Sequence, residues 1–113
     1  MHEMAIAQSI IEIVEREARR HNSGCVKRVK VQIGEFSGVV KEALEFSFEI
    51  AKNGTIAENA ELEIEIVGFK AKCRTCDFEI NGVDDFNLFC PRCKDPMEIV
   101  SGREMRVEYI EIE

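Results

Sequence analysis

The sequence predicts an α+β protein in which two helices cover a three-stranded mixed sheet and a small cysteine-rich domain is inserted before the last strand. Three observations predict this fold. Two segments repeat apolar residues with the period of a helix, three segments alternate apolar and polar residues, and four of the five cysteines fall together late in the chain. A helix between the first two strands permits a right-handed parallel crossover.

Two segments have the apolar periodicity of a helix. The first covers residues 3–21, and its apolar residues recur every three or four positions to form one broad face. Arginines gather in its last turn, where the negative end of the helix dipole favours them, and Gly24 is a typical stop signal. The second covers residues 39–52 and ends at Asn53-Gly54. Each helix can bury its apolar face against the sheet.

Three segments have the alternation of a strand. In residues 26–34 the aliphatic side chains share one face and the polar ones share the other. A second strand begins at Leu62, alternates with glutamates and can run on to Ala71, and a third covers residues 105–112. These segments predict a sheet that is buried on one face.

Length and charge exclude several classes of protein. The chain has 113 residues, which suffice for one domain with a smaller insert. Its 22 acidic and 15 basic side chains give a formal charge of −7, which repels nucleic-acid phosphates. No apolar run approaches the roughly 20 residues that a membrane-spanning helix needs. The N-terminus lacks the basic segment and cleavage site of a signal peptide. We expect a cytoplasmic protein that binds neither nucleic acid nor membrane.

Four cysteines form two CxxC pairs with 13 residues between the pairs: Cys73, Cys76, Cys90 and Cys93. Two such knuckles can face each other and present four thiolates in a tetrahedron, which is the arrangement of a closed, structural zinc site. Tetrahedral sulfur also suits iron, so a rubredoxin-like iron electron carrier is an alternative. A zinc-ribbon module that binds proteins or nucleic acids is another alternative.

The cysteines divide the chain into two predicted domains. We expect an inserted zinc-ribbon domain over residues 71–102, because so short a segment cannot build a sufficient core and needs a metal staple. Residues 1–70 and 103–113 then form the α/β domain. Cys25 stands alone upstream, and we interpret it as a small buried hydrophobic residue.

The first three residues offer a second set of metal ligands. The amine of Met1, the main-chain and imidazole nitrogens of His2 and an oxygen of Glu3 could surround a square-planar Ni(II) or Cu(II) ion. A frayed, exposed terminus without a metal is the competing interpretation. The residues alone favour it, because lone histidines are seldom ligands.

The chain resembles the HypA/HybF family of hydrogenase maturation proteins. The resemblance lies in the MHEM start, the sequence VQIGEFSGV at residues 31–39, the sequence EALEFSFE at residues 42–49 and the paired CxxC knuckles. It extends over essentially the whole chain. No single motif decides it, but the combination in a chain of this length is specific.

The resemblance implies a nickel metallochaperone, not an enzyme, that serves the assembly of [NiFe]-hydrogenase. It implies that His2 binds nickel with contributions from Met1 and Glu3, so that residues 1–70 and 103–113 form the nickel-binding domain. It implies zinc bound structurally by Cys73, Cys76, Cys90 and Cys93. The implied partners are the GTPase HypB and the hydrogenase large subunit.

The sequence departs from the family pattern at one place. Some members add an aspartate ligand from the loop before the second helix, and residues 37–42 contain no aspartate. Either Glu42 or Glu35 takes that role, or the ligand does not exist.

Overall fold

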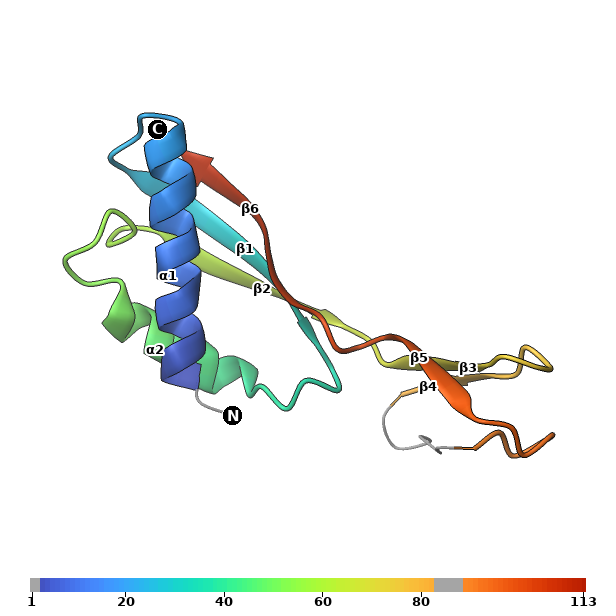
Figure 1. The fold of residues 1–113 in the computed structure, drawn as a ribbon. Helices are drawn as coiled ribbons and strands as arrows, with labels where there is room; N and C mark the ends of the chain where they lie inside the picture. Colours follow the sequence, from blue (N-terminus) through green and yellow to red (C-terminus); the bar gives the residue numbers. More distant parts are fainter. Residues whose placement is uncertain (1–2, 83–88) are drawn as a thin grey trace. The chain divides into compact units, whose positions relative to one another are not determined.

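The computed structural model describes residues 3–82 and 89–113. Within them the elements follow in the order α1 (Glu3–Arg20), β1 (Val26–Gly34), α2 (Lys41–Ala51), β2 (Glu61–Val67), β3 (Lys70–Cys73), β4 (Glu79–Asn81), β5 (Met97–Ser101) and β6 (Met105–Ile112). Two helices and mixed sheets confirm the predicted α+β class (Figure 1). No helix of this described part could span a membrane.

The chain forms two compact units, and each is described by itself. The first unit comprises Met1–Gln32, Val39–Glu65 and Arg106–Glu113. The second comprises Ile33–Gly38 and Ile66–Met105. The last two residues of β1, the last two of β2 and the first residue of β6 therefore belong to the same unit as the cysteine-rich segment. The division into a nickel domain and a zinc domain is a division of function, and it stays a prediction.

The larger sheet has the order β2-β1-β6 and is mixed. Val26 N–H donates to the carbonyl of Ile56, and Glu35 N–H donates to that of Val67, so residue numbers rise together in β1 and β2. Along β6 they fall instead, because Gly34 N–H donates to Glu104 and Phe36 N–H to Gly102. The arrows in Figure 1 accordingly show β2 running with β1 and β6 running against it.

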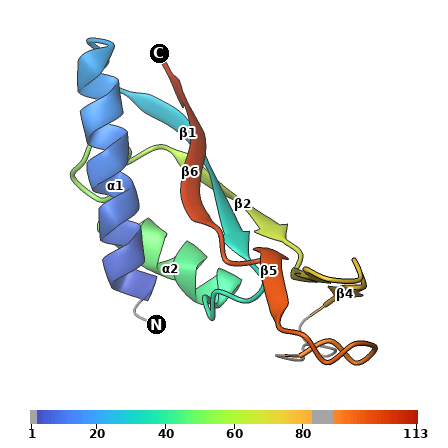
Figure 2. The ribbon, with the colours of Figure 1, turned by 45° about the vertical axis from the view of Figure 1, so that its right-hand side comes forward.

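The core of the first unit lies between the two helices and one face of the sheet. β1 buries alternate side chains toward the helices and leaves its polar face half-exposed. The helices contribute Val14, Leu44 and Phe48, all fully buried. Figure 2 shows α1 and α2 on the same side of the strands. Burial of this face in each element is what stabilises the unit.

The first helix ends differently from the prediction. Gly24 was expected to stop it, but Asn22 takes the left-handed conformation, with φ of 55°. Ser23 N–H donates to the carbonyl of Ala18, and Asn22 N–H donates to that of Arg19. This pair of hydrogen bonds is a Schellman motif, in which asparagine can replace glycine because its short polar side chain tolerates positive φ.

The second predicted strand also differs. It was expected to extend to Ala71, but β2 ends at Val67, and β3 begins a separate sheet of order β4-β3-β5. Phe69 lies between them with its N–H bonded to a carboxylate oxygen of Glu35 at 2.8 Å. A Cβ on Gly34 would overlap the carbonyl of Gly102, so the backbones approach closely where the IGEF sequence enters this second unit.

Candidate metal sites

The four cysteines of the paired knuckles meet in the second unit. Cys73 is the last residue of β3, and Cys90 lies in the loop that precedes β5. Both are fully buried. The Sγ atoms of Cys73 and Cys93 are 3.3 Å apart, those of Cys76 and Cys90 are 3.7 Å apart, and all four lie within 4.8 Å of one another. A tetrahedral zinc ion with bonds of about 2.3 Å holds its sulfurs about 3.8 Å apart. The cluster therefore fits one such ion.

The two knuckles are built alike. Cys73 N–H donates to the carbonyl of Phe78, and Asp77 N–H donates back to Cys73. Cys90 N–H donates to Asp95 and Lys94 N–H donates back to Cys90, at the same offsets. Asp77 and Lys94 both have positive φ, 60° and 68°. The fifth position of each knuckle thus needs a left-handed residue, which the CxxC spacing alone did not reveal.

Replacement of Lys94 by glycine is expected to stabilise the second unit. A non-glycine residue in the left-handed region costs about 1 kcal/mol, so glycine should raise the free energy of unfolding by about 0.5–1 kcal/mol. Thermal unfolding of the second unit, monitored through the release of zinc, would measure this change. Lys94→Ala is the matched control, because it removes the charge and keeps the Cβ. An equal gain in both variants would assign the effect to the charge instead.

Side chains join the two knuckles across the metal cluster. The hydroxyl of Thr75 donates to the carboxylate of Asp95. The guanidinium of Arg92 lies 5.7 Å from the centre of the Phe78 ring, within the range of a cation–π contact. No sequence motif marks these pairs, because their members belong to different knuckles.

Two basic residues of the ribbon form ion pairs with acidic ones. Arg74 Nε lies 3.1 Å from a carboxylate oxygen of Glu98, and Lys72 Nζ lies 3.6 Å from one of Asp77. All four side chains are largely exposed, so each pair contributes little to stability. At these two positions an acidic neighbour reduces the positive charge that a phosphate backbone would meet.

Without a bound ion the four thiols differ in acidity. The N–H of Cys76 lowers the pKa of Cys73. Burial opposes ionisation of Cys90, but the N–H groups of Cys93 and Arg92 outweigh it and lower its pKa to about 7. The N–H of Asp95 favours the Cys93 thiolate, yet the neighbouring Cys73 and burial raise its pKa to about 12.

The pKa of Cys76 is likewise raised. The N–H of Phe78 acts in the opposite direction, but burial and the nearby thiols prevail. Four thiol groups this close cannot all lose their protons unless a cation compensates the resulting negative charge. A divalent metal ion supplies that charge.

The predicted nickel ligands are placed only in part. Met1 and His2 lie outside the described residues. Glu3 is the first residue of α1, and its carboxylate accepts the N–H of Val40 at 3.3 Å. Val40 is the N-cap of α2. Glu3 therefore joins the starts of the two helices, a contact between positions 37 residues apart that the sequence does not show.

The two alternative glutamates have different surroundings. Glu35 belongs to the second unit, where one carboxylate oxygen accepts the N–H of Phe69. Glu42 is exposed in the first turn of α2, the helix whose N-cap Glu3 contacts. Of the two glutamates, Glu42 is therefore the one that lies in the first unit, in the helix whose N-cap is bonded to Glu3.

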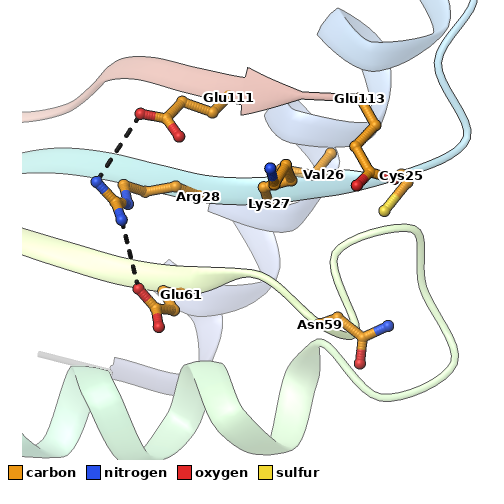
Figure 3. A pocket seen from close by; sticks show the side chains of 8 residues that line it. All are labelled: Cys25, Val26, Lys27, Arg28, Asn59, Glu61, Glu111 and Glu113. Atoms are coloured by element: carbon orange, nitrogen blue, oxygen red, sulfur yellow. Dashed lines mark ion pairs between the residues drawn. The ribbon is translucent and has the colours of Figure 1, made fainter.

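Cys25 lies outside the four-cysteine cluster. It is half-buried, so its interpretation as a buried residue is wrong. It lines a shallow pocket of the first unit with Arg28, whose guanidinium lies 3.7 Å from Glu61 and 3.8 Å from Glu111 (Figure 3). One positive charge thus lies between two negative ones. In the described chain, the four knuckle cysteines are the one cluster of three or more possible metal-binding side chains.

Fold and site together define a small α+β protein with a four-cysteine metal-binding ribbon. A family model described as "Hydrogenase/urease nickel incorporation, metallochaperone, hypA" matches residues 1–112. The chain belongs to the HypA family of nickel metallochaperones for hydrogenase maturation, which confirms the resemblance seen in the sequence.

Similar proteins match along nearly their whole length. The hydrogenase maturation factor HypA of Aquifex aeolicus is 40% identical over 114 residues, covering 100% of this chain and 98% of the relative. That of Moorella thermoacetica is 39% identical and covers 98% of each. The solution structure of the Ni metallochaperone HypA from Helicobacter pylori has a TM-score of 0.72 at 27% identity, covering 99% of this chain and 97% of that one.

Proposed function

We propose that this chain binds Ni(II) at its N-terminus and delivers it for the maturation of [NiFe]-hydrogenase. The observation that carries the proposal is the match to the nickel-incorporation family over residues 1–112, which includes the MHE start. A carrier has to collect its metal and release it again. A site at a helix terminus suits both, because the first turn can open at low cost.

The proposed nickel ligands are His2, Met1 and Glu3. An amine, a main-chain nitrogen, an imidazole and a carboxylate form a square-planar nitrogen and oxygen set, which suits Ni(II). The positive end of the helix dipole opposes a cation there by about 0.3–1 kcal/mol. The negative charges of the deprotonated amide and of Glu3 offset that opposition. The contact of Glu3 with Val40 supports the proposal, because it holds the carboxylate at the start of α1.

The proposed zinc ligands are Cys73, Cys76, Cys90 and Cys93. Their sulfur separations support one tetrahedral ion. Four protein ligands leave no position for water, so zinc here would stabilise the ribbon and not activate a substrate. Residues 71–102 would then be the zinc domain, and residues 1–70 with 103–113 the nickel domain.

The proposed partners are the GTPase HypB and the hydrogenase large subunit, and the proposed role is that of a non-enzymatic carrier in the cytoplasm. Membership in a hydrogenase maturation family supports partners of this kind. The formal charge of −7 and the ion pairs of Lys72 and Arg74 support the prediction that nucleic acid is not among them.

A transfer assay tests the function. The nickel-loaded chain is mixed with nickel-free hydrogenase large subunit, and the metal bound to each protein is measured after separation. We expect nickel to move to the large subunit while zinc stays with the chain. The control replaces the chain by an equal concentration of nickel bound to a small peptide that begins with MHE. Equal transfer from the peptide would mean that the folded protein adds nothing, and the proposal would fail.

A further inference from the structure

The chain contains two asparagine–glycine pairs, Asn53-Gly54 and Asn81-Gly82. Both asparagines are exposed, and both glycines have positive φ, 76° and 91°. An asparagine before glycine is chemically labile, because glycine has no Cβ to shield its main-chain nitrogen from the neighbouring side-chain amide. Each pair is therefore a candidate for spontaneous deamidation.

The reaction at Asn53 would proceed in two steps. Solvent base removes the N–H proton of Gly54, the nitrogen attacks Cγ of Asn53, and the bond from Cγ to the side-chain nitrogen breaks. Ammonia leaves, and a five-membered succinimide remains. Water then opens this ring at either carbonyl and leaves aspartate or isoaspartate. The net change is one water consumed and one ammonia released, with no oxidation.

The nitrogen that must attack is held by a carboxylate. Gly54 N–H donates to Oε2 of Glu58 at 2.8 Å. Glu58 is positioned by its own N–H, which donates to the carbonyl of Thr55 at 3.1 Å. Removal of the Gly54 proton would place an anionic nitrogen against a negative oxygen. A charge-assisted hydrogen bond of this kind also has to break before the nitrogen can turn toward Asn53.

The second pair is held in another way. Gly82 N–H donates to the carbonyl of Phe69 at 2.9 Å, next to the β3–β4 ladder in which Lys70 pairs with Asn81. Its acceptor is neutral and belongs to the four-cysteine unit. Asn81 therefore serves as an internal reference that Glu58 does not contact.

We propose that Asn53 is a deamidation site of this chain and that the Glu58 carboxylate suppresses the reaction. The product places a negative charge just after the C-terminal end of α2, which the helix dipole disfavours, and near Glu58 itself. Isoaspartate also adds one methylene to the backbone of the turn. This turn leads to Ile56, whose carbonyl accepts the N–H of Val26 at the start of β1.

The experiment compares the intact, zinc-loaded chain with its Glu58→Ala variant during incubation at mildly alkaline pH. Tryptic peptides 53–70 and 75–92 show deamidation by the change in mass, and fragmentation of each peptide assigns it to Asn53 rather than Asn59, or to Asn81 rather than Asn87. An isoaspartyl methyltransferase detects isoaspartate. We expect Asn53 to deamidate about tenfold faster in Glu58→Ala, which corresponds to the loss of one hydrogen bond to a charged group. Glu58→Gln keeps an acceptor without the charge and should give an intermediate rate.

Two controls separate this effect from unfolding. Glu63→Ala removes an exposed carboxylate from β2 and should leave the rate at Asn53 unchanged. The rate at Asn81 should stay the same in every variant, whereas global unfolding would accelerate both sites. The helical circular dichroism of α1 and α2 should also be unchanged, because unfolding of the first unit alone would accelerate Asn53 without affecting Asn81. An unchanged rate at Asn53 in Glu58→Ala would overturn the proposal. A slower rate would also overturn it, because Glu58 would then act as the base that promotes the reaction.

Discussion

Replacement of Cys90 by serine is expected to release the zinc and to unfold the four-cysteine ribbon. Cys90 is fully buried, and its sulfur lies 3.7 Å from that of Cys76 within the cluster. Zinc contributes roughly 10–16 kcal/mol to the folding of small structural sites, so the loss of one ligand should reduce bound zinc from one ion per chain to almost none. Elemental analysis measures the zinc, and hydrogen exchange of the β3 amides measures the unfolding.

The first unit should survive this substitution, because its core of apolar side chains includes none of the four cysteines of the cluster. The helical circular dichroism of α1 and α2 reports its fold. Cys25→Ser is the matched control, since Cys25 is a cysteine outside the cluster. It should keep its zinc. If Cys90→Ser retained a full complement of zinc, the four cysteines would not be the ligand set.

Replacement of His2 by alanine is expected to abolish nickel binding and to leave zinc and fold unchanged. The imidazole is the one side-chain nitrogen in the proposed nickel site, and its loss removes a ligand that nothing adjacent replaces. Calorimetric titration of the native-start chain with Ni(II) should show one site, and the variant should show none. An extension ahead of Met1 should have the same effect, because it converts the ligating amine into an amide.

His21→Ala is the matched control for this substitution. His21 follows the last residue of α1, and that helix of 18 residues places it about 27 Å from the N-terminal end. Its loss should not change nickel binding. Nickel affinity of the unaltered chain should also fall as the pH drops through about 6.5, because protonation removes the lone pair that binds the metal. A pH-independent affinity, or nickel found among the thiolates, would exclude His2 as the ligand.

The close of α1 and the break between β2 and β3 show where sequence patterns stop being informative. Gly24 and Asn22 are both acceptable helix terminators by their residue type, and in the structure Asn22 is the one that takes positive φ. Beyond Ile66 the apolar residues Val67, Phe69 and Ala71 alternate again with the opposite phase, so the pattern alone allows one strand to run through Gly68 and Phe69. In the structure β2 ends at Val67, and the Glu35 contact with Phe69 just beyond it joins residues 34 positions apart.

The sequence by itself determined the two helices, the strands β1 and β6, and the identity of the four cysteines that form the cluster. Helical and strand periodicity are local properties of side-chain order, and the CxxC spacing is a covalent property of the chain, so both can be read without a fold. Only the tertiary structure decided how the knuckles face each other, that Glu3 reaches Val40 and that Glu58 holds Gly54. Contacts of that kind depend on backbone paths and on chain closure, which a linear pattern does not encode.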